Sequence, residues 1–153
     1  MANTYTQLYI HFVFAVKDRA SLIMPNWQSE LYRYMNGIIE QQGHKPFAIN
    51  GISDHVHILV SMNPKQTPSD LTFHIKRSST LWINEKKLVR GKFSWQEGFG
   101  AFSYGKSQIS IITKYIDDQQ KHHLKRSFRD EYIDFLKAFD IEYDEKYVFH
   151  LIE

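Results

Sequence analysis

The chain contains no cysteine among its 153 residues. Disulfide bonds and thiolate metal ligands are therefore excluded. No apolar run approaches the roughly 20 residues that a membrane-spanning helix needs. The N-terminus also lacks the charged start and apolar centre of a signal peptide. From these absences we expect a cytoplasmic protein with no membrane partner.

A large excess of charge of one sign is also absent. The 19 Lys and Arg residues face 17 Asp and Glu residues, so the net charge is +2, which alone is weak evidence for a nucleic-acid partner. The charge is unevenly spread, because residues 130–145 carry seven of the 17 compensating acids and Glu85 is the only acid in a basic middle stretch. That stretch is either a solvated helix face followed by a loop or a surface for phosphates. Its basic residues are Lys76, Arg77, Lys86, Lys87, Arg90 and Lys92.

The length fits a single domain spanning residues 1–153. Aromatic and β-branched runs predict strands at 5–16, 46–52, 55–62 and 93–104. Helical spacing predicts helices at 27–42, 68–87, 107–123 and 127–139, with Ser69 and Ser107 as caps of the second and third. On the second helix we expect one face to carry Leu71, Ile75, Ser78, Leu81 and Trp82.

The order of the first six elements matches the βαββαβ pattern of a ferredoxin-like sandwich. The predicted fold class is therefore α+β, with an antiparallel sheet, followed by a helix that bears Tyr115 and by a further helical tail. We expect the first two helices on one face of the sheet and the other face free to bind a partner.

The triplet His55-Val56-His57 is the first candidate site. Alternate residues of a strand share a face, so both imidazoles point the same way while Val56 points into the core. Two imidazoles at this spacing are suited to a divalent metal. The alternative is an exposed strand with two solvated histidines.

The second candidate pairs Tyr115 with Gln119. At about 100° per residue, the two lie about 40° apart on one helix face. A tyrosine can be a nucleophile and a glutamine oxygen can bind a hard metal. The alternative is a half-buried aromatic residue beside a surface amide.

Together these motifs resemble the single-tyrosine HUH transposases of bacterial insertion sequences of the 200/605 type, which include REP-associated relatives. The triplet is similar to the HUH motif, and KYIDDQ is similar to the catalytic helix. FSWQEGFGAFSYGKS resembles the glycine-rich strand before that helix, and Lys17-Asp18-Arg19 fits the end of the first strand. The resemblance covers about residues 5–123, so residues 124–153 form a tail with no chemical role assigned.

The resemblance implies that His55, His57 and Gln119 bind Mg²⁺ or Mn²⁺. It implies that Tyr115 attacks a phosphate of single-stranded DNA with hairpin ends, leaving a 5′-phosphotyrosine and a free 3′-hydroxyl. That hydroxyl can reverse the reaction, so that cutting becomes joining. Tyr104 is the rival nucleophile, but no amide follows it one helical turn on.

The resemblance also implies a homodimer in which the tyrosine helix exchanges between chains, with Gly105 as a hinge or as an ordinary turn residue. Phe99 and Phe102 are either core residues or stacking platforms for bases. His123, together with His122, has either a metal role or a place at a surface helix end, while His11 and His74 are expected to be structural. The basic residues that we expect to contact DNA are Lys17, Arg19, Lys76, Arg77, Lys86, Lys87, Arg90, Lys92 and Lys106.

Three other functions stay open. A ferredoxin-like sheet with aromatic residues also suits a non-catalytic module that binds single-stranded nucleic acid. A metal-dependent hydrolase of small phosphoesters would use His55 and His57 without a protein nucleophile. A domesticated transposase relative would act on repeated palindromes.

Overall fold

The computed structural model describes residues 3–124 and 126–144. Its four strands form one antiparallel sheet in the order β2-β3-β1-β4. This order and the connections between the strands confirm the predicted ferredoxin-like α+β fold. The strands are β1 (Tyr9–Ala15), β2 (Lys45–Ile52), β3 (His55–Ser61) and β4 (Gly100–Tyr104).

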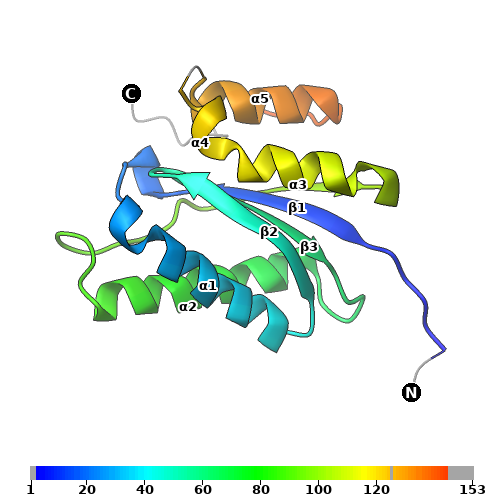
Figure 1. Ribbon diagram of the computed structural model, residues 1–153, viewed down its shortest axis with the longest axis horizontal. Coiled ribbons are helices and arrows are strands. Elements are labelled where there is room, and N and C mark those ends of the chain that lie inside the picture. Colours follow the sequence, from blue (N-terminus) through cyan, green and yellow to red (C-terminus); the bar gives the residue numbers. More distant parts are fainter. Residues whose placement is uncertain (1–2, 125, 145–153) are drawn as a thin grey trace.

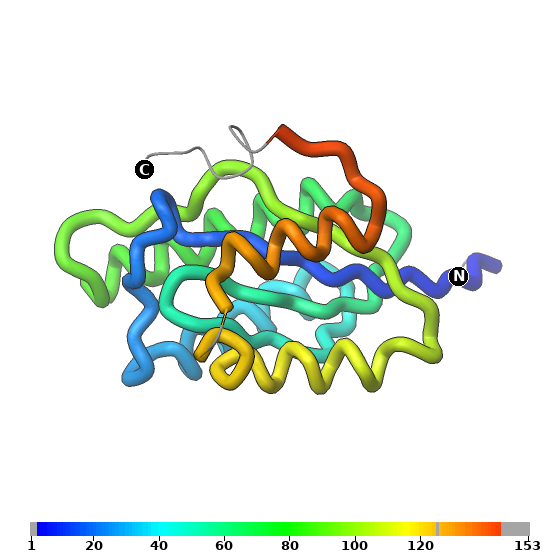
Figure 2. Tube along the Cα trace, turned by 90° about the horizontal axis from the view of Figure 1, so that it is seen from above, coloured from blue at the N-terminus to red at the C-terminus, as the bar shows by residue number. Residues whose placement is uncertain are grey.

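Helices cover both faces of the sheet (Figure 1). One face carries α1 (Pro25–Gln41) and α2 (Pro68–Glu85), and the opposite face carries α3 (Ile109–Asp117), α4 (Gln119–His122) and α5 (Phe128–Ala138). Seen from above, α3 and α5 both cross the same face, and α4 lies at the end where they connect (Figure 2). The prediction of a free sheet face is therefore wrong, because α3, α4 and the tail helix α5 cover that face.

The central strands are apolar on both sides, which explains this double cover. Along β1, Phe12 and Phe14 belong to the core under α1 and α2, whereas Val13 and Ala15 belong to the core under α5. On β3, Leu59 packs with Ile116 of α3 in a third cluster. A strand with only one buried face would leave these residues in water.

Several predicted boundaries shift. Thr67, not Ser69, caps α2 and accepts from the backbone N–H of Asp70. Ser107 caps no helix, because a short 3-10 turn, η2 (Lys106–Gln108), precedes α3. The predicted strand 93–104 is regular only from Gly100 onward. Before it Trp95 makes an isolated bridge to Val16, just after β1, and the chain turns at Gly98, whose φ of +84° favours glycine.

The buried face of α2 also differs from the prediction. Ser79 and Ile83 are fully buried, whereas Leu81 is 54% exposed. Ser79 tolerates burial because its hydroxyl donates to the carbonyl of Ile75 and accepts from the Trp95 indole. The apolar pattern alone missed this polar contact, which moves the buried stripe around the helix.

The β2–β3 hairpin depends on a glycine at position 51. A Cβ there would stand 2.2 Å from the carbonyl oxygen of His55, a backbone atom that cannot move without displacing the strand. We expect Gly51→Ala to lower the free energy of unfolding by about 3 kcal/mol. Gly37→Ala, in open space on α1, should raise it by about 0.5–1 kcal/mol. Urea unfolding followed by circular dichroism separates the two, and equal midpoints would contradict the expectation.

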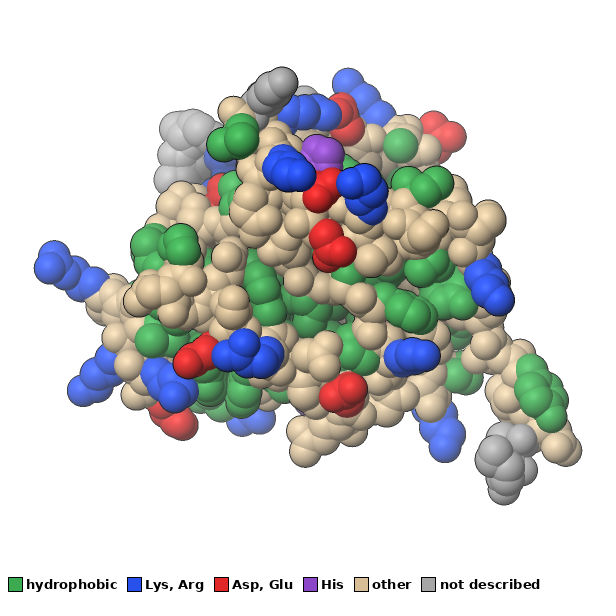
Figure 3. All heavy atoms as spheres, in the orientation of Figure 1, with side chains coloured by type: hydrophobic (Ala, Val, Ile, Leu, Met, Phe, Trp, Pro, Cys, Tyr) green, Lys and Arg blue, Asp and Glu red, His purple; other side chains and the backbone are tan. Residues whose placement is uncertain are grey.

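The exterior shows no single dominant charged patch on the face in Figure 3, where Lys and Arg side chains are scattered among acids and hydrophobic groups. No helix within residues 3–124 and 126–144 has the length and apolarity needed to cross a membrane.

Candidate functional site

Strand β3 places two histidines on the sheet face that α3, α4 and α5 cover. His55 and His57 are both fully buried on the face covered by α3, α4 and α5, while Val56 lies in the opposite core. The predicted shared face is confirmed, and the alternative of two solvated histidines is excluded. Because buried polar groups need partners, the surrounding contacts define what this pair can do.

A carboxylate from α5 lies at the centre of the site. Glu131 Oε1 is 2.9 Å from His57 Nε2, 3.0 Å from His123 Nε2 and 3.3 Å from His55 Nε2. Glu131 is only 4% exposed. Three imidazoles and one carboxylate therefore converge in a volume closed to bulk solvent.

Tyr115 and Gln119 reach the same carboxylate. The predicted continuous helix is interrupted at Asp118, so Tyr115 lies near the end of α3 and Gln119 begins α4. The Tyr115 hydroxyl donates to Glu131 Oε2, and the Gln119 amide nitrogen donates to it at 2.9 Å. Gln119 Oε1 lies 3.0 Å from His55 Nε2. The structure thus brings together all four residues of the two candidate motifs.

Sequence reasoning missed Glu131 and left two roles open for His123. The signal for Glu131 was an acid within the apolar stripe of the tail, one helical turn after Phe128, where a solvated acid does not belong. His123 is half-buried and its other ring nitrogen is 2.6 Å from the carbonyl of Arg126. His11 supports the site from β1, with Nε2 2.7 Å from His57 Nδ1.

Burial and pairing set the charges of the cluster. Burial alone would raise the pKa of Glu131, but hydrogen bonds from His123, His55 and His57 hold that pKa well below its usual range. Burial lowers the pKa of His57 to about 4. Burial and the negative charge of Glu131 raise the pKa of Tyr115. Without a further cation, the cluster therefore holds the phenol protonated.

His55 behaves differently from His57. Burial opposes its protonation, but hydrogen bonds to Asp54, at 2.7 Å, and to Glu131 raise its pKa to about 9. A raised folded-state pKa stabilises the fold below the unfolded value of about 6.5, and this stabilisation is lost as the pH rises through about 9. The charged His55 therefore stabilises the metal-free fold at neutral pH.

We expect the stability difference between the wild type and His55→Gln to shrink by roughly 2 kcal/mol as the pH rises from 7 to 9. Taking the difference cancels the titration of groups elsewhere in the chain. Urea unfolding in EDTA at several pH values measures it. His74→Gln, on α2, should track the wild type throughout, and a constant difference for His55→Gln would disprove the assignment.

The cluster can hold a metal ion. One ligand atom from each of His55, His57, His123 and Glu131 lies within 4.8 Å of the others. Imidazole and carboxylate are established ligands of divalent metals. The Gln119 oxygen adds a further donor beside His55. The chemistry and spacing of these side chains therefore fit a divalent cation.

The basic residues expected to contact DNA are dispersed. The Lys76 ammonium donates to the carbonyls of Gln96 and Gly98, at 2.8 and 2.6 Å, and burial lowers its pKa to about 8. Its side chain thus fastens the loop before β4. Arg77 is exposed on α2, in the layer opposite the cluster. The others are exposed or half-buried near element ends: Lys17 and Arg19 in η1, Lys106 in η2, and Lys86, Lys87, Arg90 and Lys92 after α2.

Residues that flank the proposed nucleophile are also placed. Lys114 pairs with Asp118 at 3.1 Å. Tyr104 lies at the end of β4, its hydroxyl 3.4 Å from His11 Nδ1. Gly105 has a φ of −85°, which any residue adopts, and a Cβ there would meet nothing within 4 Å. Its backbone therefore makes no demand for glycine.

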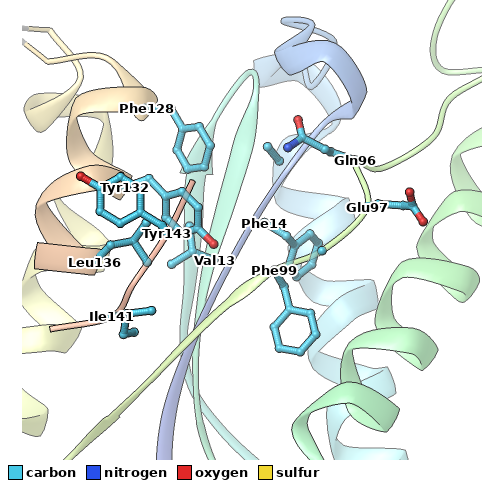
Figure 4. Close-up of a pocket in the computed structure, with 12 residues that line it drawn as sticks. Val13, Phe14, Gln96, Glu97, Phe99, Phe128, Tyr132, Leu136, Ile141 and Tyr143 are labelled. Atoms are coloured by element: carbon cyan, nitrogen blue, oxygen red, sulfur yellow. The ribbon is translucent and has the colours of Figure 1, made fainter. Parts of the chain in front are cut away.

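A pocket of about 470 Å³ lies between α5 and the loop before β4 (Figure 4). Phe99, Tyr132 and Phe128 line it, and Phe128 stacks on His55 with ring centroids 4.4 Å apart. Phe102, by contrast, is 2% exposed and stacks on Phe135 in the core under α5. Phe99 lines the pocket beside Gly98, but its ring packs against the core under α1 and α2, 6.1 Å from the ring of Phe12.

The fold and the site define a ferredoxin-like α+β protein in which a tyrosine hydroxyl meets a buried cluster of histidines. The family described as "Transposase IS200 like" matches residues 4–119. The chain belongs to this family of transposases, a class of enzymes that process DNA.

Relatives with known names are consistent with this membership. The ISDra2 transposase TnpA of Deinococcus radiodurans is 25% identical over 118 residues, covering 74% of this chain and 84% of that protein. The IS200 transposase of Salmonella typhimurium is 25% identical over 130 residues, covering 82% of each chain.

Solved structures share the fold. The crystal structure of a protein from Deinococcus radiodurans, described as a transposase, superimposes on this chain with a TM-score of 0.63 at 20% sequence identity. The match covers 78% of this chain and 95% of that one. A REP-associated tyrosine transposase bound to a REP hairpin has a TM-score of 0.60 and 14% identity, covering 80% and 73%.

Proposed function

We propose that this protein cleaves and rejoins single-stranded DNA at hairpin-flanked sites, with Tyr115 as the nucleophile. The observation that carries the proposal is the convergence of the Tyr115 hydroxyl, His55 and His57 on one buried carboxylate. Membership of the IS200-like family and the fold shared with a hairpin-bound tyrosine transposase support DNA as the substrate.

In the proposed reaction the Tyr115 oxygen forms a bond to phosphorus while the bond from phosphorus to the 3′-oxygen breaks. The products are a 5′-phosphotyrosine and a free 3′-hydroxyl. The phenol loses one proton and the departing 3′-oxygen gains one, so charge and atoms balance. Because the phosphotyrosine keeps an ester bond, a 3′-hydroxyl can attack it in reverse without ATP.

His55, His57 and Gln119 are the residues that we propose to hold Mg²⁺ or Mn²⁺. When bound, such an ion supplies electrostatic stabilisation to the charge that develops on a phosphate. Gln119 orients the site by contacting both His55 and Glu131. His11 holds the His57 ring from behind through its 2.7 Å contact, which keeps one nitrogen of His57 directed at the cluster.

The pocket beside Phe128 suits an unpaired base next to the cleaved phosphate. Its aromatic lining offers a stacking surface, and Phe128, which belongs to that lining, stacks on His55. We expect Tyr132→Ala to weaken binding of single-stranded DNA by roughly tenfold. Fluorescence anisotropy measures this, with Phe73→Ala, 60% exposed on α2, as the control. If both variants bound single-stranded DNA with equal affinity, the proposal that a base occupies this pocket would be wrong.

We propose that the exposed basic residues around the fold contact DNA phosphates. For the assembly, we propose a homodimer that exchanges the tyrosine helix between its two chains. In the chain described here, Tyr115 meets histidines of its own chain. An exchanged dimer would preserve the same contacts between two chains.

The test uses labelled single-stranded DNA carrying a hairpin from the flanks of the gene. The protein is incubated with it in Mg²⁺, Mn²⁺ or EDTA, and products are separated on denaturing gels. We expect a covalent protein–DNA band that requires metal. Binding without cleavage in either metal would favour a non-catalytic module, and cleavage without a covalent band would favour attack by water.

A further inference from the structure

Two residues after Gln119 contribute donors that the tyrosine helix α3 does not supply. His123 follows α4, and Glu131 lies in the first turn of α5. The Glu131 Oε1 atom contacts the Nε2 atoms of three histidines, at 2.9, 3.0 and 3.3 Å. Hydrogen bonds alone can produce such contacts, whereas a metal site also requires a particular spacing between its donor atoms.

The spacing matches the edges of a metal coordination shell. Two donors bound to one ion at about 2.1 Å stand about 3.0 Å apart at neighbouring octahedral positions and about 3.4 Å apart in a tetrahedron. The three contacts of Glu131 Oε1 and the 3.0 Å separation of Gln119 Oε1 from His55 Nε2 fall within or next to this range. The contacts of the Glu131 and Gln119 oxygens with the histidines therefore have the spacing of neighbouring ligands on one ion.

The donor types narrow the choice of ion. Mg²⁺ prefers oxygen ligands and retains water, whereas several imidazoles favour transition metals. Three imidazoles and one carboxylate, nearly all buried, form a nitrogen-rich site with one formal negative charge. Such a site suits Mn²⁺, Co²⁺ or Zn²⁺ better than Mg²⁺.

We propose that His123 and Glu131 complete, with His55 and His57, a site for a divalent transition metal, so that a bound ion fastens the tail helix α5 to the sheet. Gln119 lies at the edge of this site as an additional oxygen donor and as the partner of Glu131. The proposal rests on the metal requirement of the proposed function, and it extends the ligand set of His55, His57 and Gln119 by His123 and Glu131.

A titration of Mn²⁺ into the metal-free 153-residue chain, followed by electron paramagnetic resonance, tests the ligand set. We expect Glu131→Gln and His123→Gln each to weaken Mn²⁺ binding by at least about tenfold. Asp130→Asn, an exposed acid next to Glu131 on the same helix, should bind Mn²⁺ as the wild type does. Unchanged affinity in both folded ligand variants would overturn the proposal.

Wild-type protein alone provides a second readout if a variant fails to fold. Pulsed electron paramagnetic resonance counts the imidazole nitrogens on bound Mn²⁺, and we expect three. Hydrogen exchange should also slow in α5 when Mn²⁺ is added but not with equimolar Mg²⁺. Two coordinated imidazoles, no change in α5, or no Mn²⁺ binding at all would each overturn the assignment.

The two proposals fail in different ways. Three imidazoles on Mn²⁺ without a covalent DNA product would leave the tail site standing and remove the nuclease function. A metal-dependent covalent product with two imidazoles on Mn²⁺ would leave the nuclease standing and remove the tail from the site.

Discussion

Tyr115→Phe is expected to abolish the covalent protein–DNA product, with a loss of roughly a thousandfold or more. The ring of the variant keeps its contacts with His57, His122 and Phe135. Only the hydroxyl is removed, and Glu131 retains its histidine and glutamine partners. The fold should therefore lose no more than about 1 kcal/mol, so that lost activity reports lost chemistry. Denaturing gels with labelled DNA measure the product.

Tyr104→Phe is the matched control. Its hydroxyl is within 3.4 Å of His11 but makes no contact with Glu131 among the described interactions. We expect this variant to form the covalent product at close to the wild-type rate. A product that persists in Tyr115→Phe and disappears in Tyr104→Phe would transfer the nucleophile to the end of β4.

His57→Ala is expected to damage stability and activity together. His57 is fully buried, with Nδ1 2.7 Å from His11 and Nε2 2.9 Å from Glu131. Its removal leaves a cavity and takes a partner from each of two buried polar groups. We expect a loss of about 3–4 kcal/mol in the free energy of unfolding and of at least a hundredfold in metal-dependent cleavage. Urea unfolding in EDTA and single-turnover cleavage measure the two effects.

His74→Ala serves as the control for His57→Ala, since His74 is half-buried on α2 in the other layer. Its free energy of unfolding should lie within about 0.5 kcal/mol of the wild-type value, and it should cleave DNA at the wild-type rate. If His57→Ala matched this control in both assays, the buried histidine pair would have no part in the site.

The sequence predicted the fold well because both of its periodicities are strong. Alternation along β1 and β3 and helical spacing in α1 and α2 depend on local pattern, and the order of strands and helices then left few topologies. The same alternation placed His55 and His57 on one face. The helix termini were less predictable, because several neighbouring residues can act as the N-cap. The shift of the α2 cap from Ser69 to Thr67 shows this.

The rest of the site was not predictable because it depends on contacts between distant segments. Glu131 is 74 residues from its contact His57, and no local pattern specifies where α5 docks. The free sheet face was mispredicted for the same reason. Apolar residues such as Val13 and Leu59 point to that face. Their presence in the sequence already indicated that a layer of helices must cover it.

The cluster is built from residues in or next to β1, β3, α4 and α5, and α5 comes last of these in chain order. During synthesis the sheet and its first helices emerge earlier than α5 and can begin to pack before it. The histidines of β3 then lack Glu131 as a partner until α5 has been made. A nascent chain that lacks α5 would therefore hold the tyrosine but not the finished cluster, so the assembly of the site has to follow the synthesis of α5.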